Sequence, residues 1–357
     1  MTQTLAILLA AYRNLNSRKL FWITLMISAV GVLGFAAIGV NDRGMHVAFW
    51  QFDSPMLNSD PLNPYRITPA EFYKAAFVNL GIRWWLSVGA IVLALVSTAG
   101  IFPDLISSGS IDLYVCRPIS RWRLFLTQYA GSLAFVALQV TVFAAASFLV
   151  IGLRGGSWEP GVFLAIPLVT CIFSYLFSVC VLLGIATRST VAALLLTLLF
   201  WFLLFGLNAA DAFTLTFKTM KKHGVDPFHM QAEAGRGPGT RFGARSGPQG
   251  LPSDSSPPAA NPPAESNGWE TAYRVIHDVR SVVPKTAETA DLMNRWLLHA
   301  AHLRGVANDP ENRMFAAQKE IVETVNSQSV GWILGTSLAF EAVLLAWGAL
   351  IFSRRDF

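Results

Sequence analysis

Glu341 is the one ionisable residue that falls well inside an apolar run of this sequence, in the stretch SLAFEAVLLAWG. A carboxylate in such surroundings is costly unless it is protonated, hydrogen-bonded between helices or in contact with water. It indicates either a substrate or proton site, or an interhelical hydrogen bond to a Ser, Thr or Tyr side chain. We favour the hydrogen bond, because no second charge accompanies Glu341, and Ser174 and Tyr175 lie at a suitable depth.

A second group of residues able to do chemistry is basic. Arg117, Arg121 and Arg123 surround Pro118 in the stretch GSIDLYVCRPISRWRLFLTQYAG, between two long apolar runs. Arginine can pair with carboxylates or with phosphates. A plain turn between antiparallel helices needs only a handful of residues, and this segment is longer. It is therefore either a solvated basic turn or a surface that a partner binds.

No catalytic set accompanies these residues. The six histidines, His46, His223, His229, His277, His299 and His302, all lie outside the apolar runs. His299 and His302 share a helix face, but two ligands without a thiol or carboxylate partner favour a solvated face over a metal site. No G-x-x-x-x-G-K-[ST] loop occurs. We predict a protein that is not an enzyme, needs no cofactor or metal, and obtains any ATP dependence from a partner.

The composition indicates a membrane protein. Hydrophobic residues make up 53% of the chain and charged residues 14%, whereas soluble domains carry about 25% charged residues. The formal charge of +5 comes from basic residues at the ends of apolar runs. Because no basic patch is present, we expect no nucleic-acid partner and assign the charge to membrane orientation.

The lengths of the apolar runs predict the elements that position these residues. A bilayer core about 30 Å thick requires about 20 apolar residues in a helix. Six runs qualify: Leu20 to Val40, Trp84 to Phe102, Leu124 to Gly152, Val162 to Ala186, Val191 to Leu207 and Val330 to Phe352. The fifth run is the shortest, and Asn208 with Asp211 is expected to mark its end.

Basic residues at the span ends predict the orientation. One face collects Arg13, Arg18, Lys19, Arg117, Arg121, Arg123, Arg188, Arg354 and Arg355. The short loops of the other face carry fewer: Arg43, Arg66, Lys74, Arg83 and Arg154. Both termini are therefore predicted to be cytoplasmic. Residues 1–19 read as an uncleaved amphipathic helix in the cytoplasmic interface or as an extension of the first span.

The loops complete the predicted fold, an all-α membrane protein. Residues 20–207 hold the first five spans, with a cytoplasmic loop over 103–123, and the loop of 41–83 reads as an ordered, turn-rich cap. Residues 208–329 form an extracytoplasmic insertion, disordered over 224–268, where Gly, Pro and Ser dominate, and helical over 269–328. In the helical part, Pro284 is expected to end one helix. Residues 330–357 hold the sixth span and a cytoplasmic tail.

The basic segment resembles the corresponding part of ABC-2 type permeases, the membrane subunits of ABC exporters. The matching residues are Asp104, Gly109, Arg117, Pro118, Ser120, Arg121 and Gly131. Ser110 stands where Thr is usual in that family, and Gln128 stands where Lys is usual. The opening RNLNSRKLFWITL and the ending FSRRDF are also similar to that family. The resemblance covers both ends and the six-span layout, and leaves residues 208–328 uncovered.

The resemblance implies a half-transporter of the bacterial inner membrane that dimerises with itself or with a similar permease and binds separate ATPase subunits. The residues expected to couple to the ATPase are Asp104, Gly109, Asp112, Arg117, Pro118, Ser120 and Arg121. Those expected to anchor the chain to lipid phosphates are Arg18, Lys19, Arg123, Arg354 and Arg355. In this scheme ATP-driven closure of the ATPases pushes on the loop, and the second span transmits the push.

Two rival functions are considered. A component that transports nothing could relay ATPase motion to an outside partner, which would use the large insertion. An ion-coupled carrier would require intramembrane charges and repeated halves with broken helices, and the sequence has a single Glu and no internal repeat. The exporter permease is therefore the favoured prediction.

Overall fold

The computed structural model describes residues 19–41, 44–47, 50–52, 69–107, 120–222, 266–298, 320–321, 323–324 and 327–354. They fall into two compact units. The first unit holds the described residues within Met1–Phe205, Val282–Ala307 and Ser329–Phe357. The second unit holds those within Gly206–Ser281 and Asn308–Gln328. The boundary falls inside one long helix, α9, Thr190–Lys222.

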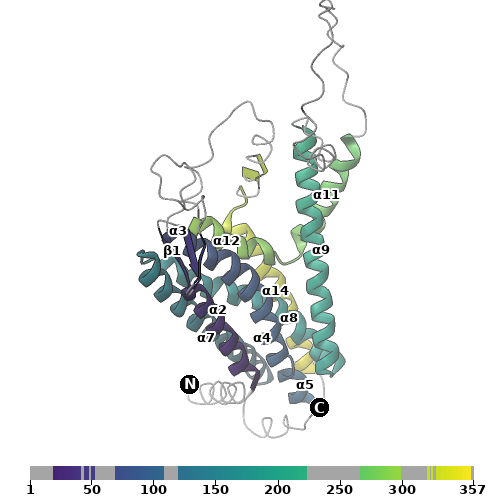
Figure 1. Cartoon of the computed structure of the whole chain (residues 1–357). Helices are drawn as coiled ribbons and strands as arrows, with labels where there is room; N and C mark the ends of the chain where they lie inside the picture. The colour runs from purple at the N-terminus through teal and green to yellow at the C-terminus, as the bar shows by residue number, and fades with distance from the viewer. Residues whose placement is uncertain are drawn as a thin grey trace, which may run out of the picture. The chain divides into compact units, whose positions relative to one another are not determined.

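The first unit is built mainly from helices (Figure 1). They are α2 Lys19–Ala37, α3 Pro69–Ala76, the π-helix η2 Phe77–Ala90, α4 Ile91–Thr98, α5 Ile101–Ser107, α7 Arg121–Gly155, the 3-10 helix η3 Pro160–Leu164, α8 Ala165–Thr187, the start of α9, α12 Thr286–Leu298 and α14 Val330–Arg354. The helices α3, η2, α4 and α5 follow one another along the second predicted span, with a short turn between α4 and α5.

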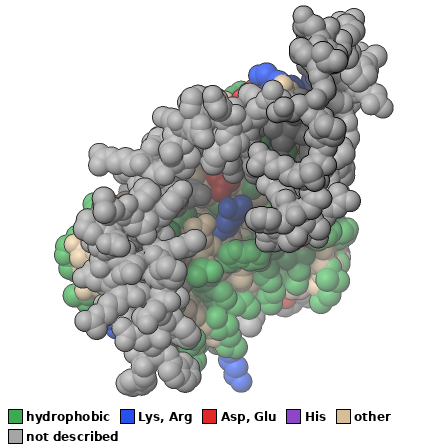
Figure 2. Space-filling view, turned by 45° about the horizontal axis from the view of Figure 1, so that its top comes forward, with side chains coloured by type: hydrophobic (Ala, Val, Ile, Leu, Met, Phe, Trp, Pro, Cys, Tyr) green, Lys and Arg blue, Asp and Glu red, His purple; other side chains and the backbone are tan. Residues whose placement is uncertain are grey.

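Five helical segments in the described part of the chain are long and apolar enough to cross a membrane. They are Phe72–Ile106, Arg121–Gly155, Pro160–Thr187, Thr190–Met220 and Val330–Arg354. Helix α2 contributes a shorter apolar stretch, Trp22–Gly34. Figure 2 shows hydrophobic side chains over much of the visible described surface. The chain therefore has the helical, apolar character of a multi-pass membrane protein.

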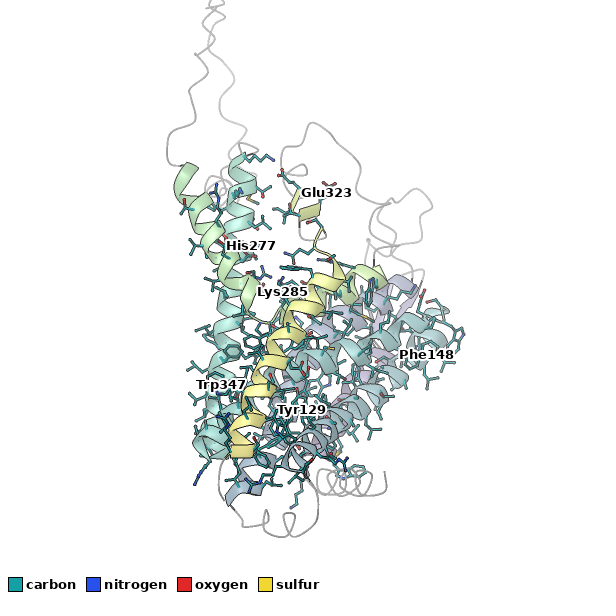
Figure 3. All side chains as sticks on the ribbon, turned by 180° about the vertical axis from the view of Figure 1, so that it is seen from behind. Tyr129, Phe148, His277, Lys285, Glu323 and Trp347 are labelled. Carbon is teal, nitrogen blue, oxygen red and sulfur yellow. The ribbon has the colours of Figure 1, made fainter. Side chains whose placement is uncertain are left out.

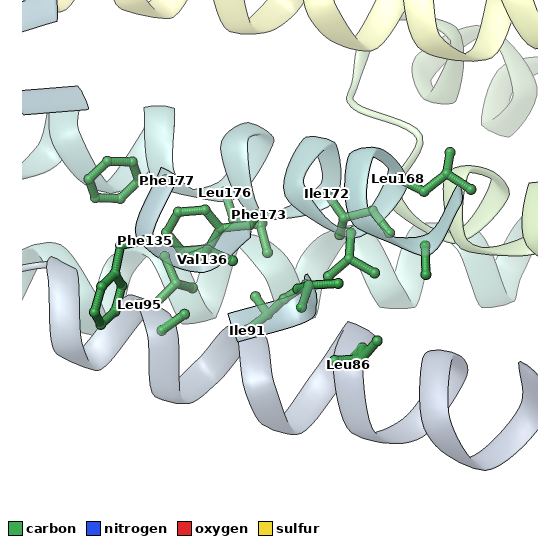
Figure 4. Packing of buried hydrophobic residues seen from close by; sticks show 14 of the residues in the cluster. Leu86, Ile91, Leu95, Phe135, Val136, Leu168, Ile172, Phe173, Leu176 and Phe177 are labelled. Atoms are coloured by element: carbon green, nitrogen blue, oxygen red, sulfur yellow. The ribbon is translucent and has the colours of Figure 1, made fainter. Parts of the chain in front are cut away.

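Helix α8 lies at the centre of the first unit. It is apolar on all sides, as expected of a helix surrounded by protein, and Phe173, Leu176 and Phe177 are fully buried. In Figure 4 these side chains lie close to Leu95 and Phe135 of the neighbouring helices. The rings of Phe173 and Phe177 stack with their centroids 5.2 Å apart. The buried core thus joins α8 to the second and third predicted spans.

Helix α12 is part of the first unit although it belongs to the predicted insertion. Leu292 and Met293 are fully buried, and the helix packs against α8, η2 and α14. Just before it, the backbone amide of Lys285 donates to the Ser337 hydroxyl of α14 at 2.9 Å. The Lys285 ammonium lies 4.9 Å from the centre of the Trp332 ring, a cation–π contact. Lys285 is labelled in Figure 3.

The end of the first predicted span, where α2 stops at Ala37, and the loop predicted as a turn-rich cap contain three short strands. They are β1 Ile38–Asn41, β2 Gly44–Val47 and β3 Trp50–Phe52, in one antiparallel sheet of order β1-β2-β3. Ile38 pairs with Val47, and Met45 pairs with Phe52. The Tyr73 hydroxyl donates to the Ile38 carbonyl at 2.5 Å and joins the sheet to α3. The all-α prediction missed this sheet, because such short strands give a weak pattern.

The second predicted span begins earlier than expected. It was placed at Trp84, but helical structure starts at Pro69. Proline is well suited to the first position of a helix, where its missing N–H is not needed. The polar Asn79 does not interrupt the helix, because its side-chain amide bonds back to the Ala75 carbonyl at 3.0 Å.

The fifth predicted span ends later than expected. Neither Asn208 nor Asp211 stops α9, which continues to Lys222. Asp211 is held by an ion pair with Arg280 of helix α11, Ser266–Val282. Thr214 returns its hydroxyl to the Ala210 carbonyl at 2.9 Å within the helix. The prediction was wrong because the partner that stabilises Asp211 is distant in sequence.

The second unit consists of the later part of α9, α11 and a few residues near 320. Besides the Asp211–Arg280 pair, Lys222 contacts Glu320 at 2.7 Å. Helix α11 ends before Pro284, as predicted. The predicted disordered segment 224–268 lies outside the described residues except for its last three, which begin α11.

Candidate functional site

The helices on either side of the basic segment meet in a buried aromatic group. Phe102 of α5, Phe125 of α7 and Phe352 of α14 are all nearly inaccessible. The centroids of Phe102 and Phe125 are 5.2 Å apart, and those of Phe125 and Phe352 are 6.0 Å apart. We call these three residues the aromatic base. They join α5 and α7, the helices that precede and follow residues 108–119, to each other and to α14.

Helix α5 also lies very close to α8. A Cβ atom added to Gly184 would lie 3.2 Å from the Pro103 side chain, so glycine is what allows this approach. Next to Pro103 is Asp104, an exposed residue in the first turn of α5. A carboxylate there interacts favourably with the partial positive charge of the helix N-terminus. The candidate coupling residue Asp104 is thus carried by a helix packed tightly on the core.

Helix α7 begins on the other side of the segment. Ser120, its N-cap, has extended backbone, and its side chain makes no capping hydrogen bond. The Arg121 guanidinium donates from Nη1 to the Ser353 carbonyl at 3.3 Å. This bond satisfies a carbonyl in the last turn of α14, where helices leave acceptors unpaired. One N–H donor of Arg121 is therefore already engaged in a hydrogen bond within the chain.

The structure brings only some of the predicted site residues together. Arg121 lies beside the end of α14, where Arg354 is exposed, and Arg123 is exposed on the first turn of α7. Lys19 is exposed at the start of α2. The remaining predicted coupling and anchoring residues lie outside the described residues: Gly109, Asp112, Arg117, Pro118, Arg18 and Arg355.

Glu341 lies in a buried polar cluster shared by three helices. The Tyr129 hydroxyl of α7 lies 2.8 Å from Glu341 Oε1, and the Ser174 hydroxyl of α8 lies 2.7 Å from Oε2. The predicted bond to Ser174 is confirmed. Tyr129 was missed, although its polar neighbours in LTQYAG set it apart within the third apolar run. Figure 3 labels Tyr129 within the helix bundle.

Tyr175, the other suggested partner, does not bond to Glu341. Its hydroxyl is buried and has no hydrogen-bond partner among the described residues. Adjacent residues of a helix point in directions about 100° apart, so Ser174 and Tyr175 cannot both reach the same carboxylate. The hydroxyls of Tyr129 and Ser174 therefore join α8 to α7 and α14.

The chemistry that these groups support is hydrogen bonding and charge recognition. In the part of the chain that the structure describes, no three His, Cys, Asp or Glu side chains are placed to hold a metal ion. The buried cluster offers hydroxyl donors to a carboxyl group, and the end of the bundle near the aromatic base offers guanidinium groups. Comparison with known protein families, curated proteins and solved structures gives no match for this chain.

Proposed function

We propose that this chain is the permease subunit of an ABC-2 type exporter, driven by separate ATPase subunits that bind its basic segment. The observation that carries the proposal is the anchoring of that segment. Its two flanking helices, α5 and α7, are joined to each other and to α14 by the aromatic base. A partner that displaces the segment would therefore act on packed helices rather than on a free loop.

The packing supplies a route for the ATPase push. Pro103 lies against Gly184, so movement of α5 is transmitted to the central helix α8. From α8 the buried cluster leads through Ser174 to Glu341 of α14 and Tyr129 of α7. Under this proposal, the basic segment receives the push and α8 distributes it to its neighbours.

The proposed protein crosses the bacterial inner membrane six times, with α2 as the first span and both termini cytoplasmic. Helix α2 has 19 residues, which correspond to about 28 Å at the α-helical rise. That length is close to the hydrocarbon thickness of about 30 Å. Trp22, Met26 and Val30 are exposed along it, as expected for a lipid-facing surface. The permease would act as a dimer with itself or with a similar chain.

A second candidate is a component that moves no substrate and relays ATPase motion to a partner outside the membrane. The second unit favours it, because α9 continues beyond the length needed for a span. The two functions differ in what stimulates the assembled complex. An exporter should show ATPase activity stimulated by its substrate, whereas a relay should respond only to the outside protein.

The proposal is tested by charge reversal. Arg117→Glu and Arg121→Glu are each expected to lower the amount of ATPase that co-purifies with the chain, because they would repel acidic groups on the ATPase. Membrane insertion should be unchanged. Arg83→Glu serves as the matched control, since Arg83 is an exposed arginine of η2, outside the basic segment. Undiminished recovery of the ATPase with both reversals would show that the segment does not bind it.

A further inference from the structure

Helix α12 lies at one end of the first unit and packs against several helices at once. Its neighbours are α8, η2, α14, α3 and η3. Figure 1 shows it with α3 and β1, at the end of the bundle opposite α5. The side chains of Thr289, Leu292 and Met293 are fully buried in these contacts. Helix α12 therefore covers this end of the helices around α8.

The contact between α12 and the bundle is polar for a protein core. Lys285, just before the helix, is 5% exposed, and Glu288, in its first turn, is 7% exposed. The backbone amide of Lys285 donates to the buried Ser337 hydroxyl of α14 at 2.9 Å. Removing charged groups from water costs free energy even when they are paired. This cost offsets part of the stabilisation that Leu292 and Met293 gain by burial.

Tyr175 of α8 shows that the hydrogen bonds of this contact are incomplete. Its side chain is fully buried, and its hydroxyl has no hydrogen-bond partner among the described residues, although Thr289 and Ser337 lie near it. Thr289 donates instead to the Lys285 carbonyl at 2.7 Å, and Ser337 donates to the Ile333 carbonyl at 2.9 Å. A buried hydroxyl without a partner is destabilising. Water would supply the missing bond if α12 moved away.

The sequence of α12 also allows this helix to leave the core. Its 13 residues, TAETADLMNRWLL, include the charged residues Glu288, Asp291 and Arg295, which water solvates well. Helix α8, by contrast, has no charged residue between Ala165 and Thr187 and would expose apolar surface on every side. A segment with a polar contact and a small apolar face separates from the protein at a lower free-energy cost than the core around it.

We propose that α12 is a lid, which separates as a unit from α8 and α14 and opens this end of the bundle while the other helices stay packed. Opening exposes Tyr175 and Ser337 to water, completes the hydrogen bonds of Tyr175, and hydrates Lys285 and Glu288. In the topology proposed above, this end of the bundle is extracytoplasmic. That the lid releases an exported substrate rests on the proposed function; its movement does not.

The test measures how fast a cysteine beneath the lid reacts with a membrane-impermeant methanethiosulfonate reagent. The full chain is placed in phosphatidylcholine nanodiscs with Ser337→Cys as the reporter, and its natural cysteines are replaced by alanine: Cys116, Cys171 and Cys180. Ser337 is fully buried, so the reporter should react slowly while the lid is closed. Leu292→Ala loosens the lid and should raise the rate about tenfold or more, because about 1.4 kcal/mol of lost packing corresponds to a factor of ten.

Leu95→Ala is the matched control. Leu95 is also a fully buried leucine, but its helix, α4, packs chiefly against α2, η2 and α8. Its truncation should leave the rate at the reporter unchanged. Fast reaction in the chain with Leu292 intact, no rise with Leu292→Ala, or an equal rise with both truncations would each overturn the proposal.

A disulfide gives a second measurement that leaves Leu292 unchanged. The Lys285 amide lies 2.9 Å from the Ser337 hydroxyl, so cysteines at these two positions are close enough to be bridged. Oxidation should slow hydrogen exchange of the α12 amides about tenfold or more and leave that of the α8 amides unchanged. If the α12 amides of the reduced chain exchange as slowly as those of α8, α12 is a fixed part of the core and the proposal fails. Because no ATPase is needed, such a failure is distinct from failure of the exporter proposal.

Discussion

The carboxyl group of Glu341 finds its hydrogen-bond partners within the protein, in the hydroxyls of Tyr129 and Ser174. Each carboxyl oxygen of Glu341 has one hydroxyl within 2.8 Å. Each hydroxyl also lies near a backbone carbonyl, Tyr129 at 3.1 Å from that of Ser174 and Ser174 at 2.9 Å from that of Cys171. The carboxyl group is thus accommodated by protein groups alone. This arrangement favours an interhelical contact over a binding site for an ion.

The first prediction concerns the strength of this cluster. Glu341→Leu should lower the free energy of unfolding by about 1 kcal/mol, because it removes two hydrogen bonds between helices at about 0.6 kcal/mol each, while both hydroxyls keep a backbone carbonyl as acceptor. Tyr129→Phe should cost less, about 0.6 kcal/mol and at most about 1.7, the range for single hydrogen bonds between membrane helices. Denaturant unfolding of the purified chain in detergent measures both values.

Ser147→Ala provides the control on the same helix. The Ser147 hydroxyl is buried and has no hydrogen-bond partner among the described residues, so its removal should be neutral. Combining Glu341→Leu with Tyr129→Phe should cost less than the sum of the single changes, since both remove the same bond. Strict additivity would show that the two side chains do not interact.

At the scale of elements, apolar runs predicted the helices α7, α8 and α14 closely, because burial and membrane crossing both require long hydrophobic segments. Predictions failed where a contact distant in sequence decides the outcome. Asp211 was expected to mark the end of the fifth span, but α9 continues past it, and its partner Arg280 lies 69 residues away. The three strands were missed because each has four residues or fewer.

The candidate site shows the same limit. Arg121 was identified from its motif, but its acceptor, the Ser353 carbonyl, is 232 positions away and no local pattern reveals it.

The second prediction concerns the contact between α5 and α8. Gly184→Val should force Pro103 away, since even a Cβ atom would approach it to 3.2 Å. Overpacking of this kind costs about 1–3 kcal/mol. Thermal unfolding in detergent measures the loss of stability. Under the proposed function, displacement of α5 should also reduce ATPase co-purification, because α5 leads directly into the basic segment.

Gly331→Val and Gly335→Val are the appropriate comparisons. Both glycines are helical, and no atom lies within 4 Å of a Cβ atom added at either position. They test whether valine alone disturbs a helix of this protein. If all three variants unfold at the same temperature, the close approach of Pro103 and Gly184 is not a stabilising constraint.

At the scale of the whole molecule, the interior of each unit is stabilised by a different kind of interaction. The first unit has an extensive buried core of aliphatic and aromatic side chains. In the second unit, the buried carboxylate of Asp211 forms an ion pair with Arg280, and His277 lies 3.7 Å from the same carboxylate. A unit that depends on a buried charge pair should be sensitive to the removal of one partner.

Arg280→Leu should therefore unfold the second unit selectively. The Asp211 carboxylate would remain buried without its main counter-charge, a change that costs about 3–5 kcal/mol. We expect limited proteolysis to cut α11 faster. The loss of stability that Glu341→Leu causes in the first unit should be the same with and without Arg280→Leu. Lys222→Ala is the control, because the exposed Lys222–Glu320 pair contributes at most about 1 kcal/mol. Joint loss of both units in the Arg280→Leu variant would show that they fold as one, whereas unchanged proteolysis would show that the Asp211–Arg280 pair does not hold α11 in place.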